Sequence, residues 1–206
     1  SAALDFTNEG GVGGKIRLLK NIFGLWLVQE CRRSWERAGQ TADYATLTSE
    51  AAAAEPFRSV LKNIDDPRLM APPDMVALIR EMCAEGGQPV PETRGQVVRC
   101  ALESLALKYR RTLRSLDGLL GRRTEVLHII GGGTQNKLLN QMTADACGVR
   151  VVTGPVEATA LGNIGVQAMA AGAVGSLAEM RRIIADSIEL EQYAPKDTAA
   201  WDRLDA

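Results

Sequence analysis

The stretch Glu125–Val152, EVLHIIGGGTQNKLLNQMTADACGVRVV, contains the pattern that decides the fold. Its first apolar run predicts a buried strand over Val126–Ile130, and a helical pattern follows over Gln135–Cys147. The closing VRVV predicts a second buried strand. Three glycines, Gly131–Gly133, separate the first strand from the helix, although glycine is unfavourable in both kinds of element. The corner therefore needs a main chain without side chains.

The segments on either side extend this pattern into an α/β fold. A helix rich in small residues is predicted over Glu157–Ala171, so strand, helix, strand and helix follow one another closely. That order predicts a parallel or mixed sheet covered by helices. The longest helix is predicted over Glu92–Leu116 and another over Ile22–Ala38. A hairpin is predicted at the N-terminus, with strands at Ala3–Phe6 and Lys15–Asn21.

Composition and charge exclude several classes of function. The chain has 206 residues and a formal net charge of -1, which gives no general reason to expect a nucleic acid or an acidic membrane as partner. No apolar stretch is long enough to cross a bilayer, and no signal peptide is visible at the start. We therefore expect a cytoplasmic protein that binds neither nucleic acid nor membrane. Because the sequence begins with Ser-Ala rather than Met, we also expect a piece of a longer chain.

The cysteine pattern argues against a zinc site. The 4 cysteines form no Cys-x-x-Cys pair and the chain has 1 histidine, so ligands at zinc-site spacing are missing. The cysteines are expected to be small buried hydrophobic residues in a reducing compartment. Cys83 and Cys100 flank a turn between two predicted helices and could lie close enough to oxidise, and their redox state stays open.

The glycine corner is the candidate functional site. A glycine-rich turn from a strand into a helix lets backbone N–H groups approach a phosphate, and the helix N-terminus adds favourable partial charge. The alternative is a tight turn without a ligand. Two familiar phosphate-binding motifs do not match. Asn136 stands where the dinucleotide fingerprint has its third glycine. In EGGVGGKI, Glu9 replaces the first glycine of the Walker loop and Ile16 replaces its Ser or Thr. NAD binding is therefore disfavoured.

Two further segments give the corner a context. GPVEATALGNIGVQAMAAG, residues 154–172, carries small residues along one helix face, and FTNEGGVGGKIRLLKNIFGLWLVQECRRSW begins at Phe6. With IIGGGTQNKLLNQMTADACGVRVV, the first of these resembles the adenosine-binding segment of the FGGY family of carbohydrate kinases. The second is similar to the rhamnulokinase branch of that family, as are NIDDPRLMAPPDM and ALESLALKYRRTL. The resemblance runs from Phe6 to Ala171 and implies a ribonuclease H-like α/β fold of the actin-like ATPase superfamily, with a mixed sheet flanked by helices.

The resemblance also implies roles for individual residues. The whole chain, residues 1–206, would be the nucleotide-binding C-terminal domain of a two-domain kinase. The residues expected to contact ATP are the glycines along its ribose and phosphates, an asparagine near the adenine and a glutamine on the first long helix: Gly131, Gly132, Gly133, Asn136 and Gln29. Asn21, between the second strand and that helix, is expected to contact the sugar. Without the resemblance, Gln29 is a solvated helix residue and Asn21 a helix cap.

The activity implied by the resemblance is phosphoryl transfer from Mg-ATP to the O1 hydroxyl of L-rhamnulose. The cofactors would be ATP and Mg2+, and the partners a ketose sugar and the N-terminal domain of the same protein. That domain is expected to supply the catalytic base, and the chain alone is expected to be inactive, because the candidate groups here have structural explanations: Asp65, Asp66, Asp145, Glu157 and His128. Two alternatives stay open: a kinase of the family for xylulose, fuculose or glycerol, and a non-catalytic actin-like module that binds nucleotide.

Overall fold

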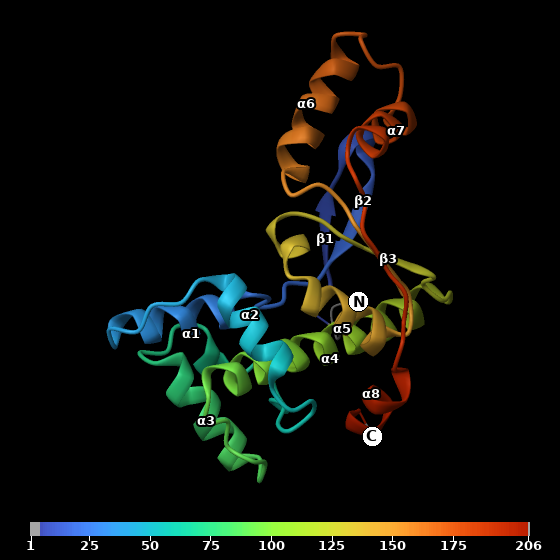
Figure 1. Cartoon of the computed structure of the whole chain (residues 1–206). Coiled ribbons are helices and arrows are strands. Elements are labelled where there is room, and N and C mark those ends of the chain that lie inside the picture. The colour runs from blue at the N-terminus through green and yellow to red at the C-terminus, as the bar shows by residue number, and fades with distance from the viewer. Residues whose placement is uncertain (1–4, 206) are drawn as a thin grey trace.

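The computed structural model describes residues 5–205 and combines helices with two small sheets (Figure 1). Four helices gather in the lower half of the molecule, namely α1 (Trp26–Arg37), α2 (Tyr44–Ala53), α3 (Met75–Glu85) and α4 (Arg94–Leu120). Two others, α6 (Ala158–Ala170) and α7 (Leu177–Ser187), stand together at its top. No helix in the described part of the chain is both long and apolar enough to cross a membrane.

The larger sheet has three strands in the order β3 (Val126–Ile129), β4 (Arg150–Thr153) and β5 (Gln192–Tyr193). β3 runs parallel to β4, while β5 runs antiparallel to it with Tyr193 opposite Val151. Helix α5 (Lys137–Cys147) connects the two parallel strands and packs against β4 and β5. The predicted strand–helix–strand–helix order and the mixed sheet are confirmed.

The two parallel strands differ in burial. The central strand β4 is buried as predicted, with Val151 fully inaccessible to solvent. The prediction that residues 126–130 form a buried strand is wrong in its burial: His128 is exposed and the other residues of β3 are only partly buried. In the described residues, β3 pairs with β4 on one side only and is an edge of this sheet, so its residues are less covered than those of the central strand.

The second sheet is the predicted N-terminal hairpin, with one strand displaced. β1 (Thr7–Gly10) pairs antiparallel with β2 (Ile16–Leu19), and the turn between them is a 3-10 turn. The prediction of the first strand at residues 3–6 is wrong at Asp5 and Phe6, which precede the strand, and residues 3 and 4 lie outside the described part. The reason is that Gly13 and Gly14, with φ of 71° and 69°, reverse the chain within a short turn, which leaves Thr7–Gly10 free to pair.

Helix α4 is the centre of the hydrophobic core and packs against α1, α2, α3 and α5. It begins with a capping box between Thr93 and Gln96, and it ends at Gly121, whose φ of 62° is left-handed. It therefore starts two residues after the predicted Glu92 and continues to Leu120, past the predicted Leu116. Cys83 of α3 and Cys100 of α4 lie in this core as free thiols, with their sulfur atoms 3.7 Å apart, so their predicted proximity is confirmed.

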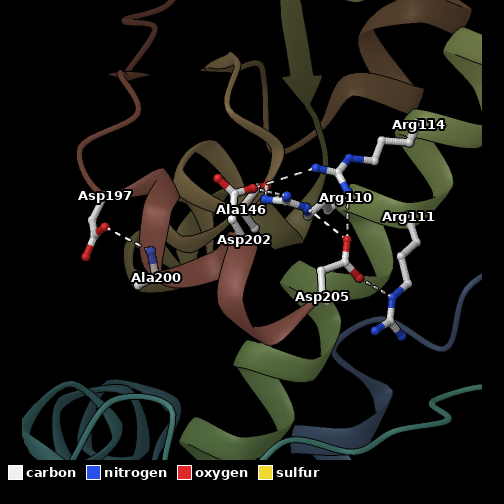
Figure 2. Close-up of polar contacts among 8 residues, drawn as sticks. All are labelled: Arg110, Arg111, Arg114, Ala146, Asp197, Ala200, Asp202 and Asp205. Atoms are coloured by element: carbon white, nitrogen blue, oxygen red, sulfur yellow. Dashed lines mark hydrogen bonds and ion pairs between the residues drawn. The ribbon is translucent and has the colours of Figure 1, made fainter.

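The C-terminal helix α8 (Thr198–Leu204) is held to α4 by a cluster of charged residues, which Figure 2 shows. The buried guanidinium of Arg110 donates to the carbonyl of Ala146 at 2.8 Å, to Asp205 at 3.1 Å and to Asp202. Arg111 also donates to Asp205, at 2.7 Å. These contacts link α4, α5 and α8, which are far apart in the sequence.

Helices α6 and α7 pack at close range because one position on α6 lacks a side chain. A Cβ atom added to Gly165 would lie 2.0 Å from the sulfur of Met180 on α7, well inside van der Waals contact. The prediction that small residues of α6 allow close packing is therefore confirmed at Gly165, whereas Gly162 has open space around it.

Candidate functional site

The glycine corner joins β3 to α5 through a 3-10 turn over Gly132–Gln135. Gly131 has φ 81° and ψ -166°, a backbone conformation that is essentially restricted to glycine. Its N–H donates to the carbonyl of Pro155 at 2.9 Å. At this position, glycine is required by the path of the main chain.

The next two glycines have a different reason. A Cβ atom added to Gly132 would meet nothing within 4 Å, and one added to Gly133 would meet only Ile129, at 4.0 Å. Protein side chains therefore do not fill the space in front of the corner. The main chain of these two residues is accessible to a ligand.

The segment after β4 lies directly beside the corner. The N–H of Gly154 donates to the carbonyl of Ile129 at 2.7 Å, and a Cβ atom on Gly154 would lie 2.7 Å from Ile130. The two motifs that were singled out in the sequence, around residues 131 and 154, thus meet where the parallel strands β3 and β4 end. Ligands of open α/β sheets commonly bind at the carboxyl ends of such strands.

A cavity of about 1050 Å³ opens in front of the corner, with a lining that comes from α1, α2, α4, β3, the 3-10 turn and α5. Four of the predicted nucleotide contacts line it: Gln29, Gly132, Gly133 and Asn136. Apolar side chains such as Leu25, Val28 and Ile129 form much of the remaining wall. The volume lies just above the range of about 300–1,000 Å³ for small-molecule sites, and a mainly apolar wall with a few polar groups is typical of such sites.

Two predicted site residues lie outside this lining. Gly131 is adjacent to it in the chain, and Asn21 is an exposed residue between β2 and α1. The alternative that Asn21 caps a helix is wrong, because α1 begins at Trp26 with Leu25 at its cap position. The predicted helix over Ile22–Ala38 starts late because Gly24, with φ 58°, lies in a turn ahead of it.

Asn136 lies immediately before α5 and not inside the helix, where the predicted start at Gln135 would place it. Its side-chain oxygen accepts a hydrogen bond from the N–H of Leu139 at 2.9 Å, which makes it the N-cap. The 3-10 turn over Gly132–Gln135 delays the start of the helix to Lys137 and so leaves Asn136 at the cap position just before it. Within residues 5–205, its amide nitrogen donates to no protein group, so it can donate to a ligand.

Among residues 5–205, the one charged side chain in the lining is Lys137, at the first turn of α5. Its ammonium group lies 2.5 Å from Glu191, and this contact raises the pKa of Lys137 and lowers that of Glu191. Both groups are largely solvent-exposed, so the pair adds little stability. Its main consequence is a cation that stays protonated beside the corner.

The carboxylates considered as catalytic groups have mainly structural surroundings. Asp66 caps the 3-10 turn at residues 67–69. Asp145 was expected to be solvated but is half-buried, and it accepts hydrogen bonds from Lys196 N at 2.7 Å and from Gln141 at 2.9 Å. Glu157 precedes α6.

The histidine of the chain, His128, lines the cavity from β3. Across residues 5–205, no group of three or more His, Cys, Asp or Glu could hold a metal ion.

Sequence reasoning missed two residues that hold the corner in place. Thr134 is buried and its hydroxyl donates to the carbonyl of Gly131 at 2.8 Å, while Asn140 is buried and its amide donates to the carbonyl of Thr134 at 2.8 Å. A signal was present, because Asn140 interrupts the apolar face of α5 between Leu139 and Met142. A buried polar side chain on such a face needs a partner.

Comparison with known proteins supports the family resemblance. Residues 2–171 match the C-terminal domain of the FGGY family of carbohydrate kinases. Rhamnulokinase of Bacteroides thetaiotaomicron is 56% identical over 200 residues, which cover 97% of this chain and 40% of that protein. Rhamnulokinase of Pectobacterium carotovorum is 46% identical over 210 residues, which cover 99% of this chain and 41% of that protein. The chain thus spans about 40% of the length of the curated relatives it matches.

A solved structure shows the same fold. The crystal structure of xylulose kinase from Rhodospirillum rubrum superposes with a TM-score of 0.64 and 21% sequence identity, over 97% of this chain and 40% of that one. The predicted α/β fold of the actin-like ATPases is therefore confirmed. Since the match to the family covers most of the sequence, the chain belongs to the FGGY family of carbohydrate kinases and contains the C-terminal domain of that family.

Proposed function

We propose that the intact protein is a rhamnulokinase, which transfers the γ-phosphoryl group of ATP to the O1 hydroxyl of L-rhamnulose and releases L-rhamnulose 1-phosphate and ADP. The observation that carries this proposal is the 56% identity to the rhamnulokinase of Bacteroides thetaiotaomicron over 97% of this chain. The open cavity in front of the glycine corner supports it, because a nucleotide needs such a space.

This chain would supply the binding site for the nucleotide. The apolar walls at Leu25 and Val28 suit the faces of a purine, and the free amide of Asn136 suits an acceptor on its edge. Gln29, from the opposite wall, would donate to the nucleotide as well. The bare main chain of Gly131–Gly133 would lie along the ribose and phosphates, and the N-terminus of α5 would favour their negative charge.

The remaining parts of the reaction belong to the N-terminal domain, which we propose as the partner of this chain. That domain would supply the base that takes the proton of the O1 hydroxyl, and Asn21 would contact the sugar from this side. Closure of the two domains would exclude water, so that the phosphoryl group passes to the sugar and not to water. Phosphoryl transfer is catalysed mainly by positioning and charge stabilisation, and a preformed nucleotide site provides the first of these.

Magnesium is proposed as the ion that accompanies ATP. It usually keeps several waters and binds through substrate phosphates and one or two carboxylates, so it needs no dedicated cage of protein ligands. When bound, it neutralises part of the charge on the β- and γ-phosphates. We place the reaction in the cytoplasm, where ATP is available and free thiols such as Cys83 and Cys100 stay reduced.

The test is a coupled assay of ADP release by the intact enzyme. L-Rhamnulose, D-xylulose, L-fuculose and glycerol are compared at equal concentration, and the product is identified by mass and by the position of its phosphate. The proposal predicts the highest kcat/KM for L-rhamnulose and phosphate on O1. Equal rates with all four acceptors, or a faster rate with another acceptor, would reject L-rhamnulose as the substrate. ADP release that is independent of any sugar would reject the assignment of the protein as a sugar kinase.

A further inference from the structure

The corner presents its glycines to the cavity through a small internal network. The carbonyl of Gly131 accepts two hydrogen bonds from Thr134, one from its N–H at 3.1 Å and one from its hydroxyl at 2.8 Å. The carbonyl of Thr134 in turn accepts from the amide of Asn140 at 2.8 Å. These contacts tie the 3-10 turn to the buried face of α5, where Asn140 also lines the cavity.

Neither of the two side chains is needed in order to fill space. Valine has the shape of threonine, and an apolar residue would suit the interior beside Leu139 and Met142. Asn140 is only 1% exposed, and its amide oxygen has no hydrogen-bond partner within the described residues, which is costly in a buried site. Thr134 is therefore explained by the hydrogen bond that its hydroxyl gives to the corner, and Asn140 by its bond to the corner together with a contact to the hydroxyl of Tyr193.

The network also fixes a main chain that has few internal restraints of its own. Gly131 lies in a region of backbone conformation that only glycine adopts, and the two glycines after it lack side chains that could pack. Glycine has more conformational freedom to lose than any other residue. Without Thr134 and Asn140, the corner would sample several conformations, and only some of them would leave the backbone facing the cavity.

We propose that Thr134 and Asn140 are positioning residues of the nucleotide site: they hold the carbonyls of Gly131 and Thr134 inward, so that the main chain of Gly132 and Gly133 faces the ligand. The proposal rests on the proposed function, since it takes the ligand to be the nucleotide. Among the described residues, Thr134 is outside the lining of the cavity and Asn140 is part of it, so Thr134 acts on the ligand only through the main chain. Both residues order the corner before the ligand binds, so the free energy of binding is not reduced by the cost of that ordering.

The test compares matched variants of the intact enzyme. Thr134→Val removes one hydroxyl and keeps the shape of the side chain, and Thr134→Ser keeps the hydroxyl. Thr124→Val is the control, because Thr124 also donates from its hydroxyl, to Asp117, but lies at the opposite end of β3. Calorimetry with ADP gives the affinity directly, and steady-state kinetics give separate KM values for ATP and for L-rhamnulose.

The expected result is a roughly 3- to 10-fold weaker ADP affinity and higher KM for ATP in Thr134→Val, the effect of one hydrogen bond. The KM for the sugar stays unchanged, Thr134→Ser restores the ADP affinity, and Thr124→Val binds ADP like the parent enzyme. Unchanged ADP affinity in Thr134→Val would overturn the proposal, as would an equal loss in Thr124→Val. A parent enzyme that binds ADP but does not phosphorylate L-rhamnulose would reject the proposed function alone, and a parent that binds no ADP would reject both.

Discussion

Two adjacent glycines at the corner are expected to respond in opposite ways to the same substitution. Gly132 tolerates a side chain, because an added Cβ atom meets nothing within 4 Å and its φ is not positive. Gly131→Ala forces alanine into φ 81° and ψ -166°, which costs about 1–3 kcal/mol. Gly132→Ala should change the free energy of unfolding by no more than about 0.5 kcal/mol, as for other substitutions away from packed contacts.

The Gly132→Ala substitution should also weaken nucleotide binding. The new methyl group of Gly132→Ala would stand in the cavity where the ribose and phosphates are proposed to lie. Overpacking by one methyl costs about 1–3 kcal/mol, which corresponds to roughly 5- to 150-fold weaker binding. A large loss of affinity without a loss of stability is therefore the signature of a ligand-facing glycine.

The assay pairs urea unfolding with calorimetric titration of ADP on the intact protein. Gly118→Ala is the matched control, because Gly118 lies in α4, has open space around it and is remote from the corner. It should gain stability and bind ADP normally, since alanine is the better helix residue. If Gly132→Ala binds ADP like the parent, Gly132 does not face the nucleotide. If the Gly132→Ala variant loses as much stability in urea as Gly131→Ala, the space in front of Gly132 is not open.

Two further predictions concern stability. Gly95→Ala should destabilise the protein by about 1–3 kcal/mol or more in urea, because its Cβ atom would lie 2.4 Å from the backbone oxygen of Glu50 and would force α2 and α4 apart; an unchanged unfolding midpoint would contradict this. Arg110 holds the pKa of Asp202 below its ordinary value, so the stabilisation is present above about pH 3.9 and is lost as the pH falls through the lower, folded pKa. The measurement is hydrogen exchange of the α8 amides, corrected for the intrinsic exchange rate. Exchange should accelerate as the pH falls through the folded pKa of Asp202 and should stay constant at higher pH. Equal protection at all pH values would contradict the role of Asp202.

The sequence predicted those parts of the fold that depend on local periodicity. Helix α4 is long and residues 149–152 are mostly apolar, so both patterns could be read from the sequence. The glycines at 131–133 could be recognised as well, because neither a strand nor a helix favours glycine. The tail predicts a helix, a short extended piece and a final short helix, and α7, β5 and α8 confirm this order, but the pairing of β5 with β4 could not be predicted, because it joins distant segments. The exposure of β3 also depends on its neighbours in the sheet.

Gly132, Gly133, Asn136 and Gln29, which the family resemblance implies as nucleotide contacts, line one cavity, and their contact with a nucleotide stays a prediction. Residues that act through a distant partner were missed. The contact between Arg110 and Asp202 joins residues that are 92 positions apart, and no local sequence pattern predicts such a contact. The 3-10 turn that moves Asn136 to the helix cap is set by Gly131 and its hydrogen bonds, which are features of the folded chain.

The most direct test of the central claim is a crystal structure of the intact protein with ADP or a non-hydrolysable ATP analogue. The account predicts that the adenine lies in the cavity between Gln29 and Asn136, with the ribose and phosphates against the main chain of Gly131–Gly133. A nucleotide bound elsewhere, with the cavity at the corner occupied by protein side chains or left empty, would contradict it.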